Sequence, residues 1–310
     1  MQEFPLLFSR FPFAVKIQRN FLAYVDTGGA RLISIVVPCF NCANSIGRQV
    51  EALLSQSYAG EVEILLVNNR SSDSTGEILR NLAQKFDCIQ YVDASSVQGI
   101  NHARNCGIRA SRGEVILFCD ADDVVQSVWI ERYAQAFRAG AMLAGGGLLR
   151  SFRGDVSIPS PPNIGLWSLE SPAGANCGMH RSVVETIGYF DESYLGGGDE
   201  TDFFWRAQIS GFAFVWLAEA TVEYVLRSSA GDFRRQQYMY GRSHAKLYRE
   251  FRSYGMPQSI AYRSILSVFK SVLELILSRS GTWRNRNALG KLSLHAGRLA
   301  GSIRFGVVYL

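Results

Sequence analysis

The stretch GEVILFCDADD, residues 113–123, decides the fold class. Five consecutive apolar residues, 115–119, come directly before the carboxylates of Asp120, Asp122 and Asp123. An apolar run without polar alternation predicts a strand that is buried on both faces, in a sheet covered by helices on each side. The three acids then mark the point where the chain leaves that sheet.

Similar apolar runs lie upstream, and amphipathic helical patterns separate them. We expect strands at residues 33–38, 62–67 and 89–92, and helices at residues 46–57, 75–86 and 100–110. This alternation predicts an α/β fold, in which ligands bind beyond the carboxyl ends of the strands. Polar clusters follow the expected strands at 38–41, 68–73 and 120–123, so the sequence predicts a functional site there.

Charge divides the chain into an acidic and a basic part. The net charge is −7 over residues 1–226 and +12 over residues 227–310, where 15 basic residues face 3 acidic ones. Hydrophobic residues at 47% exclude a disordered chain, and six cysteines are too few for a disulfide scaffold. We expect an N-terminal extension over 1–31, an α/β domain over 32–228 and a basic helical segment over 229–310.

We expect neither a secretory signal nor a transmembrane helix, and therefore a cytoplasmic protein. The most apolar segment, residues 264–277, contains Lys270 and Glu274 and is shorter than the ~20 residues that span a bilayer.

The acids after residue 119 have two interpretations. Hard divalent cations prefer oxygen ligands, and Mg²⁺ commonly takes one or two carboxylates together with substrate phosphates. Aspartates also cap turns and helices without binding any metal. The apolar strand before Asp120, and the polar clusters after its neighbours, favour a site for a metal and a diphosphate.

Taken together, seven ordered motifs resemble the family 2 glycosyltransferases of the GT-A fold. They are ISIVVPCFN (33–41), VNNRSSDST (67–75), GINHARNCG (99–107), GEVILFCDADD (113–123), GAN (174–176), GYFDE (188–192) and GDETDFFWR (198–206). The resemblance covers residues 33–227, about two thirds of the chain. It implies that residues 32–228 are a GT-A catalytic domain and that the chain is a metal-dependent, inverting glycosyltransferase of the hexosyltransferase type.

The resemblance also implies a donor site for a nucleotide-diphosphate sugar, most often a UDP-sugar. The positions that match donor-binding residues are Pro38, Phe40, Asn41, Asn69, Arg104, Asn105, Asp120, Ala175 and Asn176. Among them, Pro38 and Phe40 border the uracil pocket and Asn69 reads the base edge. The second acid, Asp122, matches the ligand of a Mn²⁺ or Mg²⁺ ion that bridges the diphosphate, and Asp120 lies nearer the ribose.

The acid pair at residues 199–200 departs from the family pattern. Family members usually carry Glu-Asp with the aspartate as general base, whereas this chain has Asp199 followed by Glu200. By position Glu200 is the expected base and Asp199 the second candidate. The alternative is that the pair caps a helix over 201–209. A second departure, Asn68-Asn69 in place of acidic residues, weakens the implied preference for uridine.

Glu223 takes a position where similar members often carry a metal-binding histidine. Glutamate is an acceptable ligand for a hard cation, so we expect Asp120, Asp122 and Glu223 to form the metal site. A strand residue that faces solvent is an equal alternative.

The basic segment suggests a membrane surface as partner. Residues 260–277 have apolar positions at helical spacing, and we expect Arg263, Lys270 and Arg279 on the opposite side. The alternative is a helix that packs on the catalytic domain. We expect a peripheral protein on the inner face of the membrane, with a glycan or lipid-linked acceptor in cell-envelope polysaccharide synthesis, and no nucleic acid. Two other functions stay open: a nucleotide-sugar-binding protein without catalysis, and a membrane-tethered scaffold.

Overall fold

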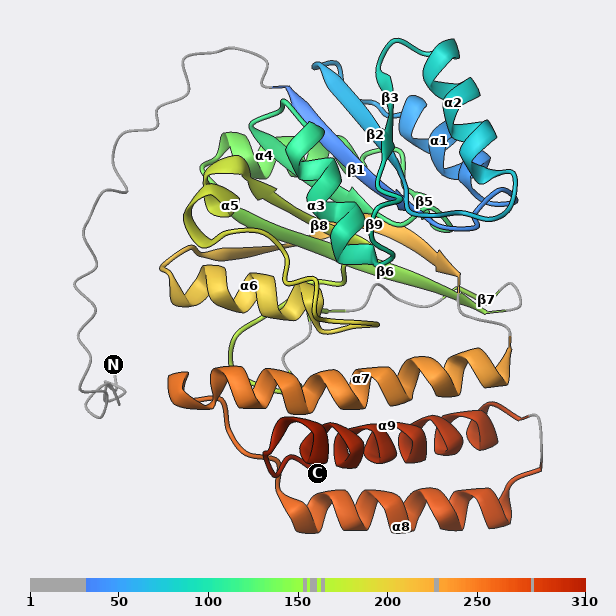
Figure 1. Ribbon diagram of the computed structural model, residues 1–310, viewed down its shortest axis with the longest axis vertical. Coiled ribbons are helices and arrows are strands. Elements are labelled where there is room, and N and C mark those ends of the chain that lie inside the picture. The colour runs from blue at the N-terminus through green and yellow to red at the C-terminus, as the bar shows by residue number, and fades with distance from the viewer. Residues whose placement is uncertain (1–31, 153–154, 157–160, 163–164, 226–228, 280–281) are drawn as a thin grey trace, which may run out of the picture.

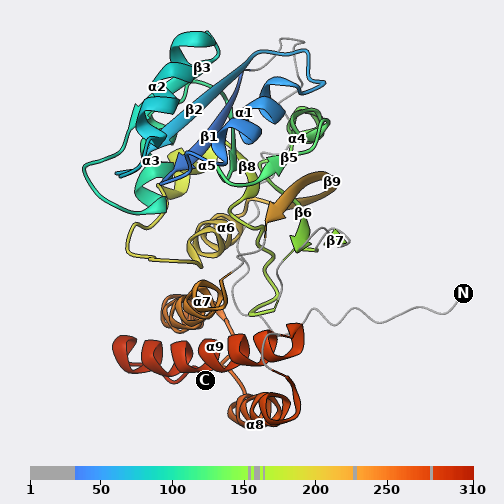
Figure 2. The same ribbon diagram turned by 90° about the vertical axis from the view of Figure 1, so that its right-hand side faces the viewer.

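The computed structural model describes residues 32–152, 155–156, 161–162, 165–225, 229–279 and 282–310. The predicted N-terminal extension, residues 1–31, lies outside them. The described residues form an α/β domain that rests on a layer of long C-terminal helices (Figure 1, Figure 2).

A mixed sheet forms the centre of the α/β domain. Its order is β3-β2-β1-β4-β8-β6-β9-β5, and β7 pairs with β6 at the side. The pairs β1–β2, β1–β4, β2–β3 and β6–β9 are parallel, whereas β8 runs antiparallel to both β4 and β6. The strands are β1 (Ile33–Cys39), β2 (Val62–Asn68), β3 (Ile89–Asp93), β4 (Val115–Cys119), β5 (Val124–Val125), β6 (Leu143–Phe152), β7 (Asp155–Val156), β8 (Asn176–His180) and β9 (Phe214–Val225).

Helices cover both faces of this sheet, as the apolar strands predict. Alternate β1 residues divide between two cores: Ile35 and Val37 face α1 and α4, and Val36 faces α3, α5 and α6. The helices of the domain are α1 (Ile46–Leu54), α2 (Thr75–Lys85), α3 (Ile100–Ala110), α4 (Trp129–Arg138), α5 (Arg181–Ile187) and α6 (Asp199–Ile209).

The predicted elements agree with the structure in the first half of the chain. The strand 115–119 and the helix 100–110 have the predicted bounds, and the helix predicted at 46–57 ends at Leu54.

Three C-terminal helices form the basic layer: α7 (Ala230–Phe251), α8 (Ala261–Leu277) and α9 (Trp283–Phe305), with a 3₁₀ turn at Arg252–Tyr254 after α7. In space α9 lies between α7 and α8, so α8 is the outermost helix (Figure 1, Figure 2). Within the described part of the chain, none of the helices has the length and apolar character needed to cross a membrane.

Helix α7 connects this layer to the α/β domain. Buried Lys246 of α7 donates to Asp191 at 2.7 Å and to Ser193 at 2.5 Å, both in the loop before α6. Trp205 of α6 packs edge-on against Phe251 of α7, with ring centroids 5.3 Å apart. Packing on the catalytic domain, the alternative interpretation of the C-terminal segment, is therefore observed for α7.

Glycines allow α7 and α9 to approach closely. A Cβ at Gly297 of α9 would overlap the carbonyl oxygen of Tyr238, and one at Gly241 of α7 would overlap that of Leu294. In both cases the obstacle is backbone, which cannot rotate away.

We expect Gly297→Ala to destabilise the protein. Helix propensity alone would favour alanine by about 1 kcal/mol, but the overlap with Tyr238 should cost about 1–3 kcal/mol more than that gain. Chemical denaturation measures the free energy of unfolding. The matched control is Gly47→Ala in α1, where a Cβ meets nothing within 4 Å and alanine should be neutral or stabilising. Equal stability of both variants would contradict the close approach.

Candidate functional site

The parallel strands bring the predicted site residues to one edge of the sheet. β1 and β2 stay in register up to Cys39 opposite Asn68, and β4 runs parallel to β1 on its other side. The loops that follow these strands therefore meet at the same edge.

Three carboxylates gather in the loop between β4 and β5. One oxygen from each of Asp120, Asp122 and Asp123 lies within 4.8 Å of the others. The buried side chain of Gln49 holds this loop at both ends: it donates to the carbonyl oxygen of Asp120 at 3.0 Å and accepts from the backbone N–H of Val125 at 3.1 Å. The fold thus fixes the loop, with Asp122 exposed and Asp123 buried.

This set of oxygen donors suits a hard divalent cation. Carboxylates held this close repel one another, and a cation between them relieves that repulsion. Carboxylate oxygens are also the ligands that Mg²⁺ and Mn²⁺ prefer. The cluster contains both predicted aspartates, and Asp123 joins them.

Glu223 is not part of this cluster, which corrects the predicted ligand set. It lies on β9 opposite Val124, and both residues are partly exposed, whereas the next pair, Val125 and Val222, is buried. Side chains alternate along a strand, so Glu223 lies on the same face of the sheet as Val124. This favours the alternative that Glu223 is a strand residue that faces solvent. Asp123 takes the place in the cluster that the sequence had suggested for Glu223.

Arg104 of α3 connects the carboxylate cluster to the acid pair. Its buried guanidinium forms an ion pair with Asp199 and lies 4.0 Å from Asp120. Gly174 permits this placement, because a Cβ there would overlap Nη2 of Arg104. Burial by itself lowers the pKa of Arg104, but the carboxylates of Asp199 and Asp120 raise it above its usual value. The guanidinium therefore remains a cation at the centre of the site.

The two acids at the start of α6 have different environments. Asp199 is buried and carries the ion pair with Arg104. Burial and the neighbouring Asp199 carboxylate raise the pKa of Glu200 well above its usual range, although Arg104 lowers it. A raised pKa makes the ionised Glu200 a stronger base. Because Arg104 engages Asp199, Glu200 stays the first candidate for the base and Asp199 the second.

The turn before the acid pair contacts α7. Gly197 has a φ of 116°, and a Cβ at this position would overlap the ring of Tyr240. The helix begins at Asp199, its N-cap is Gly198, and no side chain caps it. The acid pair therefore lies within the first turn of α6 and not before a helix that begins at residue 201.

The side chain of Asn176, predicted to contact the donor sugar, instead forms hydrogen bonds within the protein. Its Oδ1 accepts from Trp129 at 2.7 Å and Tyr133 at 2.8 Å, and its Nδ2 donates to the carbonyl oxygens of Gly147 and Ala220. These four hydrogen bonds use the whole capacity of a buried amide. As a correction, the Asn176 side chain joins α4 to the sheet and has no hydrogen bond left for a sugar.

Asn105 also holds a loop. It donates to the carbonyl oxygen of Phe190 at 3.0 Å and to Glu192 at 2.8 Å, and it accepts from the N–H of Phe190 at 3.0 Å. Its side chain is 2% exposed. Asn105 therefore holds the loop that contains Phe190 and Glu192, next to Arg104 in the sequence of α3.

Asn69 holds the loop between β3 and α3. Its Nδ2 donates to the carbonyl oxygens of Ala94 and Val97, both at 2.7 Å, and its Oδ1 accepts from the N–H of Gly99 at 2.7 Å. Base reading through its Nδ2 would require the release of one of these bonds.

The element 38–41 lies at the edge of the same site. Phe40 is 51% exposed and Pro38 is half-buried. Asn41, with a φ of 48°, is held by Ser71 and Ser72 of the next loop, through hydrogen bonds of 3.1 and 2.7 Å. Ala175, the remaining predicted donor residue, is 4% exposed beside Gly174.

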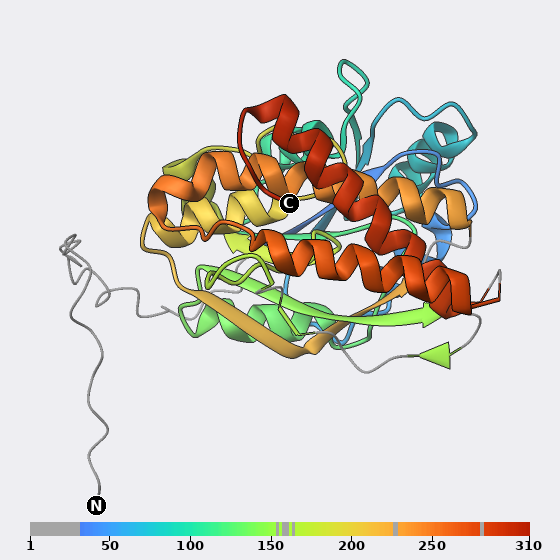
Figure 3. The same ribbon diagram turned by 90° about the horizontal axis from the view of Figure 1, so that it is seen from below.

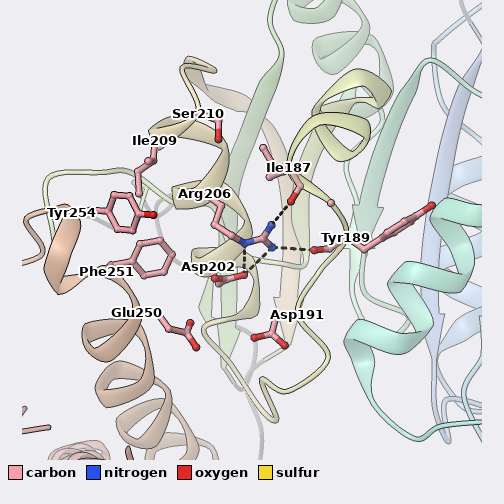
Figure 4. A pocket seen from close by; sticks show the side chains of 11 residues that line it. Ile187, Tyr189, Asp191, Asp202, Arg206, Ile209, Ser210, Glu250, Phe251 and Tyr254 are labelled. Atoms are coloured by element: carbon pink, nitrogen blue, oxygen red, sulfur yellow. Dashed lines mark hydrogen bonds and ion pairs between the residues drawn. The ribbon is translucent and has the colours of Figure 1, made fainter. Parts of the chain in front are cut away.

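A pocket of about 660 Å³ lies elsewhere, between α6 and α7 (Figure 4). Arg206 in its wall binds Asp202 at 2.9 Å and donates to the carbonyl oxygens of Ile187 and Tyr189. Burial raises the pKa of Asp202 to about 6. Asp120, Asp122 and Asp123 do not line this pocket. The candidate site is therefore identified by the chemistry of its side chains and not by the volume of a pocket.

Comparison with known proteins agrees with this geometry. The family model described as "Glycosyl transferase family 2" matches residues 34–192. Glycosyltransferase AglE of Haloferax volcanii is 28% identical over 54% of this chain and 58% of its own length. The succinoglycan biosynthesis protein ExoM of Rhizobium meliloti is 26% identical over 81% of this chain and 85% of its own.

The fold also has solved neighbours. The mannosyltransferase PcManGT from Pyrobaculum calidifontis, in complex with GDP-Man and Mn²⁺, superposes with a TM-score of 0.58 at 15% identity, over 89% of this chain and 88% of that one. This similarity supports the GT-A fold. Among the curated relatives, the match spans 58% of the length of AglE and as little as 14% of the length of another protein.

Proposed function

The chain belongs to the family 2 glycosyltransferases, and on that premise we propose a metal-dependent, inverting transfer of a sugar from a nucleotide-diphosphate donor. The acceptor is a glycan or a lipid-linked sugar in polysaccharide synthesis. One observation carries the proposal: Arg104 lies against both Asp199 and Asp120, so the acid pair and the carboxylate cluster form a single site.

On the donor side, Asp120, Asp122 and Asp123 would hold the metal. A bound Mn²⁺ or Mg²⁺ supplies positive charge that stabilises the departing diphosphate. The exposed ring of Phe40 suits stacking on a nucleotide base. The resemblance favours uracil, and guanine is the competing base because the solved mannosyltransferase holds GDP-Man.

On the acceptor side, Glu200 removes the proton from the attacking hydroxyl. That oxygen then forms a bond to the anomeric carbon while the bond from this carbon to the diphosphate oxygen breaks. The ion pair of Arg104 with Asp199 holds the first turn of α6 in place. Inversion follows from the single displacement that the resemblance implies.

We further propose that the C-terminal segment, residues 229–310, contacts the inner face of a membrane. The net charge of +12 over residues 227–310 suits an anionic surface. A lipid-linked acceptor would be presented at that surface.

The alternative function is nucleotide-sugar binding without transfer. The order of the acid pair favours it, because this chain has Glu200 where the family pattern implies an aspartate as general base.

The proposal is tested by calorimetric titration of the whole chain with UDP, GDP and dTDP, each with and without Mn²⁺. We expect UDP to bind only in the presence of the metal, since the phosphates meet the carboxylates without it. Binding of none of the three would contradict the enzyme proposal. Metal-dependent binding without sugar transfer to any acceptor would support the alternative.

A further inference from the structure

The outermost helix, α8, turns its apolar side away from the protein. Eight large apolar side chains on it are 42–74% exposed: Tyr262, Ile265, Leu266, Phe269, Val272, Leu273, Ile276 and Leu277. At 3.6 residues per turn they occupy one continuous arc of roughly 140°. The buried residues of α8 are instead Ser264 and Ser271, on the opposite side.

The serine side of α8 faces the rest of the protein. Ser264 donates to the carbonyl oxygen of Leu310 at 2.6 Å, and Ser271 donates to that of Ser267 at 2.8 Å, one turn earlier. Among the described helices, α8 makes its main contact with α9 (Figure 3). A helix on a protein surface normally buries its apolar stripe, so this orientation is reversed and, among the residues that the structure describes, nothing covers the stripe.

Positive charge surrounds the exposed stripe. Arg263 and Lys270 are exposed and lie at one border of the arc, next to Leu277, and not opposite the stripe as the sequence had suggested. Arg279 is exposed just beyond the helix. Residues 261–310 contain eight basic residues and one acidic residue.

We infer that this face of α8 lies in the surface of a bilayer that contains anionic lipids, an inference that rests on the proposed membrane contact and assigns it to one helix. Apolar side chains enter the boundary between headgroups and acyl chains, while Arg263, Lys270 and Arg279 meet the lipid charges. α8 lies in the plane of the membrane, because its other side is attached to α9.

Charge argues against a second copy of the chain as the occupant. Pairing two α8 faces would bring two strongly basic helical layers together, and like charges across an interface are unfavourable. An anionic bilayer offers the complementary charge. Helix α7 also carries several arginines. Because it lies between the α/β domain and α9, it is not the helix that we assign to the bilayer (Figure 2).

The test is flotation of the whole chain with phosphatidylcholine vesicles, with and without phosphatidylglycerol. We expect binding to the vesicles that contain phosphatidylglycerol. The double variant Phe269→Glu/Ile276→Glu should bind them more than about tenfold more weakly, since two inserted side chains become charged. Both side chains are more than 60% exposed, so the fold and nucleotide binding should not change. The matched control is Leu54→Glu, an exposed leucine at the end of α1.

Two results would overturn the inference: wild-type affinity of the double variant, or equal binding of the wild type to both kinds of vesicle. In a second experiment, Phe269→Trp should shift its fluorescence to the blue only when phosphatidylglycerol vesicles are added. A blue shift that grows with protein concentration without vesicles would identify a second copy as the occupant. Nucleotide affinity and sugar transfer, measured separately, show whether the enzyme proposal holds.

Discussion

Glu200→Gln is expected to lower kcat by about 10²- to 10⁴-fold while the affinity for the donor nucleotide stays unchanged. The amide keeps the size of the side chain but cannot accept the proton of the acceptor hydroxyl. Transfer assays and calorimetry on the same preparation separate the two effects. Wild-type turnover of this variant would remove Glu200 from the mechanism and leave Asp199 as the base.

The pH dependence of the wild type provides a second readout of the same group. Only ionised Glu200 can accept a proton, and burial and Asp199 raise its pKa, so the rate should increase as the pH rises through that raised value. Asp199→Asn removes the neighbouring negative charge and should lower the pKa of Glu200. The acidic limb of the profile should then move to lower pH. An unmoved limb would contradict the coupling of the two acids.

Asp122→Ala is expected to abolish the metal-dependent part of nucleotide binding, with a loss of at least about 100-fold in affinity in the presence of Mn²⁺. Changes to residues that only support a metal ligand already cost 10- to 100-fold, so loss of a ligand should cost at least that. Asp122 is exposed, and the variant should fold normally. Calorimetric titration with UDP measures the effect.

The control for this variant is Asp87→Ala, which removes an exposed aspartate between α2 and β3. It changes the net charge equally and should leave nucleotide binding as in the wild type. Unchanged Mn²⁺ dependence in Asp122→Ala would show that the metal assignment is wrong.

The sequence predicted the first half of the fold well because several of its strands are nearly continuous apolar runs. Such a strand, as in 115–119, is compatible only with a sheet covered on both faces, and parallel strands then bring their carboxyl ends together. The placement of Asp120 and Asp122 at one edge followed from this reasoning. The family and the fold class, both inferred from ordered motifs, are confirmed.

The contacts within the site could not be predicted in the same way. Arg104 and Asp199 are 95 residues apart, and no local pattern tells that they form an ion pair. Asn176 matches a donor-binding position, yet its neighbours in space saturate its hydrogen bonds. Glu223 had the right chemistry for a metal ligand, but the strand alternation that directs its side chain depends on how β9 pairs with β5.

The basic segment shows a related limit. Its sequence suggested contact with a membrane and, as the alternative, packing on the catalytic domain. Periodicity alone does not show which helix makes which contact. In the structure α7 packs on the catalytic domain through Lys246 and Phe251, whereas the apolar face of α8 is exposed.

The order in which the three C-terminal helices are layered determines how far an acceptor must reach. The glycine turn before Glu200 touches α7, α9 lies on the far side of α7, and α8 lies beyond α9. Neighbouring helix axes are 8–10 Å apart, so a bilayer that touches α8 lies roughly 20 Å below α7. A hydroxyl that belongs to the lipid headgroup itself would not reach across this distance. Under the proposed membrane contact, this layer would favour acceptors that already carry several sugar units.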